Sequence, residues 1–84
     1  MHFELGNAYF QLQQWPEAVQ AFKKAAELEP MDSSAAYNVA AALSNDNYRS
    51  DAIPWFREAL RRNPNRPDKA EILTKIDASL ALAR

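Results

Sequence analysis

The fold is decided by the stretch AVQAFKKAAELEP at residues 18–30, because a related stretch, AIPWFREALRRNP, follows at residues 52–64. Four residues keep their spacing between the copies: Ala18, Phe22, Ala25 and Pro30 recur as Ala52, Phe56, Ala59 and Pro64, always 34 residues later. A fixed period of this length is typical of proteins built from stacked structural repeats. The chain is therefore predicted to contain two copies of one structural unit.

Each copy has the pattern of a helix that packs closely against another. Its alanine, aromatic and second alanine stand four and three residues apart, which places them on one helical face. The proline then ends the helix, because it lacks an N–H donor and restricts the residue before it. Small or apolar residues also pair across the period upstream: Leu5 with Val39, Gly6 with Ala40, and Ala8 with Ala42. Each unit is thus predicted to be a helix, a turn and a second helix.

Five helices are expected, the first four over about residues 1–13, 16–28, 34–44 and 48–62, and the last after residue 68. Asp32 or Ser33 can cap the third helix, and Asp68 with Glu71 resembles a capping pair for the fifth. Pro54 is expected in the first turn of the fourth helix, where its missing donor costs little. The fifth helix is expected to bury a face formed by Leu73, Ile76, Leu80 and Ala83, flanked by Ile72.

Leu5-Gly6, Tyr9, Ala18, Phe22, Ala25 and Pro30, spaced as they are within this period, resemble the signature of the tetratricopeptide repeat. The resemblance implies an all-α fold, in which antiparallel helix-turn-helix units stack into a short right-handed α-solenoid of five helices. It divides the chain into repeat one at residues 1–32, repeat two at 33–66 and a C-terminal capping helix at 67–84. Because no polar helix precedes the first repeat, the chain is either a piece of a longer array or has its first face covered otherwise.

Composition excludes several functional classes. The 84 residues carry a net charge of −1, whereas a nucleic-acid-binding domain is expected to have a strongly basic face. There is no cysteine for a disulfide or a thiolate metal site. No stretch resembles a signal sequence or is long enough to cross a bilayer. We therefore expect a soluble, cytoplasmic protein without membrane insertion.

Catalytic residues are also scarce. His2 is the single histidine, and one glycine, Gly6, cannot form a phosphate-binding loop. Neither a nucleophile with an oriented base nor a metal cluster can be assembled from these side chains. We expect no enzymatic activity, no metal and no cofactor, and we interpret Gly6 as a site of close helix packing.

Binding of a protein or peptide is the leading hypothesis. The family resemblance implies that the first helices of successive units line a concave groove. Aromatic rings there supply contact area, and amides can bond the main chain of a bound segment. The groove residues are predicted to be Phe3, Asn7, Phe10 and Gln11 in the first unit, and Ser34, Tyr37, Asn38, Ala41 and Asn45 in the second. The same rings could instead serve mainly to pack neighbouring helices.

One kind of binding site known in this family can be compared with this sequence residue by residue. In the carboxylate clamp that holds the acidic C-terminal tails of chaperones, Asn7 and Asn38 match the two asparagines of the family pattern. Phe3, Asp68 and Ile72 stand where three basic residues belong, so a free carboxylate would be poorly held. We expect no useful affinity for such tails, and micromolar binding of an acidic tail peptide in calorimetry would contradict this.

Self-association is the alternative hypothesis. Fewer than three full repeats bury little core, so a second copy could cover the uncapped first helix by forming a homo-oligomer or a domain swap. A monomeric mass that is independent of concentration would count against it.

Overall fold

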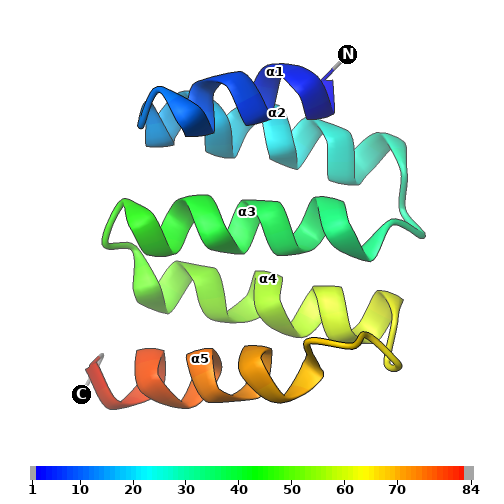
Figure 1. Ribbon diagram of the computed structural model, residues 1–84, viewed down its shortest axis with the longest axis vertical. Helices are drawn as coiled ribbons and strands as arrows, with labels where there is room; N and C mark the ends of the chain where they lie inside the picture. The colour runs from blue at the N-terminus through cyan, green and yellow to red at the C-terminus, as the bar shows by residue number, and fades with distance from the viewer. Residues whose placement is uncertain (1, 83–84) are drawn as a thin grey trace.

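The computed structural model describes residues 2–82, which form a stack of five helices and contain no strand. Their bounds are α1 His2–Gln11, α2 Trp15–Leu28, α3 Ser33–Asn45, α4 Arg49–Arg62 and α5 Lys69–Leu82. Each helix runs antiparallel to the one before it and packs on it, and the 33 Å axis of the molecule follows the stacking direction (Figure 1). The predicted all-α fold, a short solenoid of five helices, is confirmed.

The repeated alanine–aromatic–alanine face forms the core, as its spacing predicts. Phe22 and Phe56 are each 1% exposed. The alanines at both ends of the two faces are also buried: Ala18, Ala25, Ala52 and Ala59. Small side chains beside each ring let the neighbouring helices approach, so the rings fill the space between helices rather than forcing them apart.

The turns within the two helix pairs are built alike. Gln13 and Asn47 both adopt a left-handed backbone, with φ of 59° and 65°. The next amide closes each turn, from Gln14 to the Tyr9 carbonyl at 2.9 Å and from Tyr48 to the Leu43 carbonyl at 2.8 Å. Asparagine tolerates this conformation better than most residues, as predicted for the second turn.

The third helix begins at a side-chain cap. The Asp32 carboxylate accepts hydrogen bonds from the amides of Ser34 and Ala35, so of the two candidates Asp32 is the capping residue. Such a cap pairs amides that the first helical turn leaves without partners.

Two predictions about local structure are wrong. Pro54 is the sixth residue of α4, which begins at Arg49, so it lies inside the helix beyond the first turn. In α5 the predicted Ile76 and the flanking Ile72 are buried together with Ser79, but Leu73 and Leu80 of the predicted face are 45% and 40% exposed. The helix is rotated by about one residue from the expected face. Ala83 and the side chain of Leu82 lie outside the described residues.

Gly6 lies where α1 packs tightly on Phe22 of α2. A Cβ at this position would stand 2.5 Å from one carbon of the Phe22 ring. Because that ring is almost fully buried, moving it aside would disturb the packing of the core and cost free energy. This contact supports the interpretation of Gly6 as a packing residue.

Gly6→Ala is therefore expected to lower the free energy of unfolding by about 1–2 kcal/mol, since overpacking outweighs the better helix propensity of alanine. Urea unfolding followed by circular dichroism measures the change. In the double variant with Phe22→Leu, the added cost of Gly6→Ala should largely vanish, because the smaller side chain leaves room. A single variant as stable as the natural chain would refute the steric explanation.

Candidate functional site

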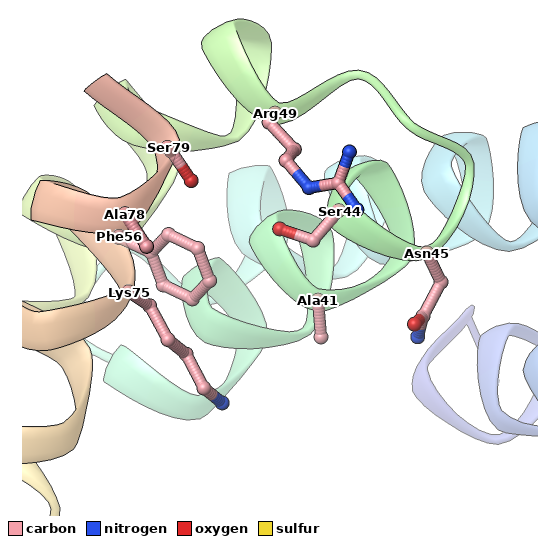
Figure 2. A pocket seen from close by; sticks show the side chains of 8 residues that line it. All are labelled: Ala41, Ser44, Asn45, Arg49, Phe56, Lys75, Ala78 and Ser79. Atoms are coloured by element: carbon pink, nitrogen blue, oxygen red, sulfur yellow. The ribbon is translucent and has the colours of Figure 1, made fainter. Parts of the chain in front are cut away.

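A pocket of about 260 Å³ lies where α3, α4 and α5 meet. Its lining comes from all three helices: Ala41, Ser44 and Asn45 from α3, Arg49 and Phe56 from α4, and Lys75, Ala78 and Ser79 from α5. In Figure 2 the Phe56 ring and Ala41 flank the hollow, and the polar ends of Lys75 and Arg49 lie on different sides of it. The pocket therefore combines an apolar interior with two cationic groups.

The pocket residues share the period of the repeats. Asn7, Ala41 and Lys75 follow one another at intervals of 34 residues. The same spacing relates Phe10, Ser44 and Ala78, and it relates Gln11, Asn45 and Ser79. The α5 side of the pocket thus occupies the register in which the groove residues of the first two units were predicted.

Two predicted groove residues, Ala41 and Asn45, line this pocket. The other predicted residues lie elsewhere on α1 and α3. Asn7 and Asn38 are half-buried, whereas Gln11 and Ser34 are exposed. Phe3 is 40% exposed, and its ring centroid is 6.2 Å from that of Phe22.

Phe10 is used largely for packing. Its half-buried ring meets Trp15 edge-on, with centroids 4.9 Å apart, and lies 6.3 Å from Phe22. Edge-to-face pairs of this kind stabilise a fold beyond the area they bury. Part of the aromatic surface expected in the groove therefore holds α1 on α2.

Tyr37 connects α3 to α5 and to the segment before it. Its ring meets Phe56 edge-on at 5.8 Å, and the Arg66 guanidinium lies 5.0 Å from its centroid. The Lys75 ammonium donates a hydrogen bond of 2.9 Å to the Tyr37 hydroxyl. Removing the whole side chain would loosen α5 as well as change the groove, so Tyr37→Phe is a cleaner probe of binding than Tyr37→Ala.

Arg66 fixes the start of α5. It donates to the Ser33 hydroxyl at 2.8 Å and to both oxygens of Asp68, at 2.8 and 3.0 Å. The hydrogen bonds from Arg66 hold the pKa of the Asp68 carboxyl below its usual value. Asp68 stands directly before α5, as predicted for a cap, but its carboxylate is engaged by this guanidinium.

The clamp positions are occupied in other ways. Ile72 is fully buried, and Asp68 is paired with Arg66, so neither presents a positive charge to the groove. The lack of affinity for acidic tails remains a prediction.

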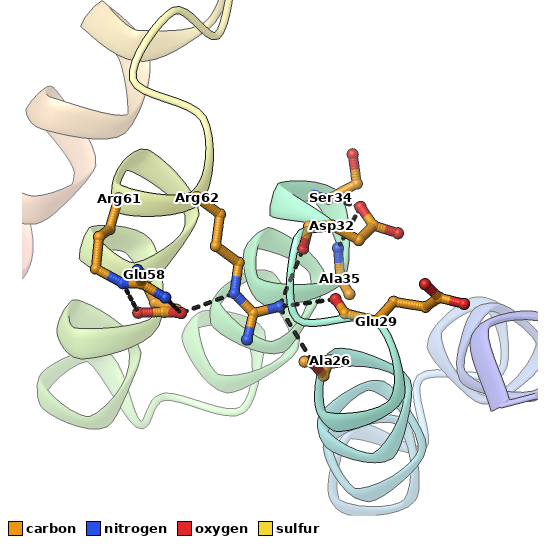
Figure 3. Close-up of polar contacts among 8 residues, drawn as sticks. All are labelled: Ala26, Glu29, Asp32, Ser34, Ala35, Glu58, Arg61 and Arg62. Carbon is orange, nitrogen blue, oxygen red and sulfur yellow. Dashed lines mark hydrogen bonds and ion pairs between the residues drawn. The ribbon is translucent and has the colours of Figure 1, made fainter.

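A second cluster of charges joins the two repeats. The Arg62 side chain reaches from α4 to the end of α2 and the loop after it, where its Nη1 donates to the carbonyls of Ala26, Glu29 and Asp32 at 3.1–3.3 Å (Figure 3). Its Nε donates to Glu58 at 2.7 Å. A guanidinium suits this place because the last carbonyls of a helix carry partial negative charge. These contacts are structural, and the sequence motif does not reveal them.

The same cluster predicts a dependence of stability on pH. Hydrogen bonds from Arg61 and then Arg62 lower the pKa of the Glu58 carboxyl from 4.5 to about 2. Since the folded pKa lies below the usual one, the stabilisation is present above pH 4.5 and is lost as pH falls towards 2. The Glu58 side chain is 26% exposed, so solvent screening limits the effect to about 1 kcal/mol.

Glu58→Gln should therefore be less stable than the natural chain at pH 7, and the two should have nearly equal stability at pH 2. Urea unfolding at several pH values measures this difference. A constant difference across the range would show that the charge of Glu58 is not the cause.

Among residues 2–82, no cluster of three or more histidine, cysteine, aspartate or glutamate side chains could hold a metal ion. In the same part of the chain, no helix is long and apolar enough to span a bilayer. The pocket lining supplies hydroxyl, amide and cationic groups next to an aromatic ring, which is a composition suited to recognition.

The sequence pattern leaves six pocket residues unidentified: Ser44, Arg49, Phe56, Lys75, Ala78 and Ser79. Extending the 34-residue period by one more step, from Ala41 and Asn45 into α5, would have found Lys75 and Ser79. Arg49 has no such signal, because it enters the pocket from the start of α4.

Comparison with known proteins agrees with the architecture. A search of curated protein sequences gives no match. The profile of the tetratricopeptide repeat matches residues 3–67, which is most of the chain and includes both copies of the repeated stretch. Tetratricopeptide repeats generally mediate protein–protein interaction and are generally non-catalytic. By this match and by its five stacked helices, the chain belongs to the tetratricopeptide repeat family.

Proposed function

We propose that the protein is a non-enzymatic scaffold or adaptor module that binds an extended or helical segment of a partner protein along a groove lined by α1, α3 and α5. The observation that carries this proposal is the shared register of Asn7, Ala41 and Lys75 and of Gln11, Asn45 and Ser79. Side chains at equivalent positions of successive helices can contact a segment that runs across the stack.

Three properties of the groove residues support this use. Asn7 and Asn38 are half-buried, so their amides are held in place while keeping some access to solvent. The pocket next to Ala41 offers a place for one side chain of the partner. The Tyr37 ring packs edge-on against Phe56 of α4, which gives a bound segment a firm surface. The repeats and the final helix are proposed to act as one domain in the cytoplasm.

Selection of displayed random peptides on the purified chain tests the proposal, because a random library offers segments of many chemistries to the groove. A recovered peptide is then synthesised and titrated into the isotope-labelled protein by nuclear magnetic resonance. We expect amide shifts in α1, α3 and α5. The double variant Asn7→Ala/Asn38→Ala should weaken binding at least about tenfold.

Gln20→Ala is the matched control, because Gln20 is an exposed amide on α2 and lies outside this groove. It should leave the affinity unchanged. Peptides whose binding is equally insensitive to the groove variant would show that the groove is the wrong site.

A specific observation also favours the second candidate function, self-association through α1. Leu5 on α1 is 48% exposed, and Leu12, in the turn directly after α1, is 66% exposed. Ala8 lies between them and is also exposed. A hollow beside Leu5 and Tyr9, lined further by Pro16 and Ala21, could receive side chains from a second copy.

Light scattering coupled to size exclusion over a hundredfold range of concentration tests self-association. A dimer that dissociates in the variant Leu5→Gln/Leu12→Gln would support the α1 interface. A monomer at every concentration would exclude this function for the isolated chain.

A further inference from the structure

The pocket between α3, α4 and α5 gathers hydrogen-bond donors that have no partner in the described part of the chain. Ser79 is only 5% exposed, yet its hydroxyl makes no hydrogen bond within residues 2–82 and points towards the hollow in Figure 2. Among these residues no side-chain polar atom is both sealed from solvent and unpaired, so the hydroxyl opens into the hollow. Arg49 likewise forms no ion pair with any described residue. The Ser79 side chain has little contact with water and Arg49 is an exposed cation, so a ligand in the hollow can pair with both donors.

Lys75 supplies a second charge in a fixed position. Its ammonium donates to the Tyr37 hydroxyl at 2.9 Å and lies 5.3 Å from the centroid of that ring. A neutral phenol orients the ammonium without cancelling its charge, and an ammonium has three donors, so others remain for a ligand. None of the residues that line the pocket is acidic. The lining therefore carries two cationic side chains and no anionic one, and Asp68, which interacts electrostatically with Lys75, lies outside it.

The interior of the pocket is apolar. Ala41 and Ala78 provide small apolar surfaces suited to methylene groups, and the almost fully buried Phe56 ring lies behind them (Figure 2). A ligand that fits must join a short aliphatic part to an anionic end that can accept several hydrogen bonds. A glutamate or aspartate side chain has this construction.

We propose that this pocket holds a carboxylate side chain of the partner segment, and that the segment is therefore acidic at the position that meets α5. The inference rests on the proposed function and adds the chemistry of the partner. It differs from the chaperone clamp in both residues and ligand. Arg49, Lys75 and Ser79 hold the carboxylate here, and the carboxylate is an internal side chain rather than a free C-terminus.

The probe is a peptide of alternating glutamate and leucine, acetylated at its start and amidated at its end, and titrated into the isotope-labelled chain. The comparison peptide has glutamine in place of every glutamate. We expect the glutamate peptide to shift the amides of Ala41, Ser44, Ala78 and Ser79. It should bind at least about tenfold more tightly than the glutamine peptide, because charge-assisted hydrogen bonds are lost in the latter. A free C-terminus should add no affinity.

Arg49→Gln and Lys75→Gln should each weaken the glutamate peptide about tenfold. The matched controls are Arg57→Gln on α4 and Lys69→Gln on α5, which remove exposed charges outside the pocket. The spectrum of each free variant shows whether it is folded. Because Arg49 makes no ion pair within the described residues, its variant keeps the test valid even if the Lys75 variant loosens α5.

Each outcome decides the question. Glutamate and glutamine peptides that bind equally well, or variants that bind like their controls, would overturn the carboxylate assignment. So would saturable binding of inorganic phosphate at these amides without binding of the glutamate peptide. If displayed peptides shift α1 and α3 but the glutamate peptide does not bind, the groove function stands and the acidic partner is refuted. If no displayed peptide shifts the groove, both proposals fail.

Discussion

Replacing Phe56 with alanine is expected to lower the free energy of unfolding by about 3–5 kcal/mol. The ring is 1% exposed, packs edge-on against Tyr37 and lies among the buried residues of α3, α4 and α5. Its removal leaves a cavity that the rigid alanines around it cannot close. A domain of this length has a total stability of roughly 4–13 kcal/mol, so the variant should be largely unfolded on mild warming.

Phe3→Ala is the matched control, because the same side chain is 40% exposed at the edge of α1. We expect its cost to be much smaller. Urea unfolding followed by circular dichroism compares the two variants. Equal costs would show that the core is not centred on the repeated aromatic.

Arg62→Met is expected to cost about 2–3 kcal/mol, since hydrogen bonds to a charged group contribute more than neutral ones and the carbonyls at the end of α2 lose their donor. Methionine keeps most of the aliphatic length, so the loss reports the guanidinium rather than packing. The Arg62 side chain is 10% exposed, and its bonds span 30 to 36 residues of sequence. Urea unfolding measures the global cost, and hydrogen exchange at the amides of residues 29–35 measures the local one.

Arg61→Met serves as the control for this variant. Arg61 also pairs with Glu58, but its side chain is 69% exposed and its described bonds reach no other helix. We expect stability close to that of the natural chain. If the two arginine variants lose the same stability, the link between α2 and α4 is not the source of the effect.

The sequence predicts the core well because the core repeats. Phe22 and Phe56 stand in equivalent places, so each copy is evidence for the other, and their burial follows. Most residues of the fifth helix have no matching residue in an earlier copy that would support the assignment of its buried face. Its two apolar stripes, Ile72–Ile76 and Leu73–Leu80, overlap, and the docking of the turn held by Arg66 decides which of them is buried.

Long polar side chains are the other part that a pattern cannot predict. Arg62, Arg66 and Lys75 find partners about 30 or more residues away, and those distances depend on how the helices stack. The pocket is of the same kind, since Arg49 enters it from the first turn of α4. The period extends the predicted groove register into α5, but it does not indicate that the Ser79 hydroxyl lacks a partner among residues 2–82.

The bond between Lys75 and Tyr37 makes α5 one wall of the proposed binding site. A segment that touches both α3 and α5 would bind only while the last helix is docked. Bound ligand would therefore favour the docked state of α5. At saturating ligand, undocking of this helix would become rarer by mass action. Amide protons along α5 would exchange more slowly as more of the protein is bound. Partner binding would therefore stabilise the C-terminal end of the solenoid.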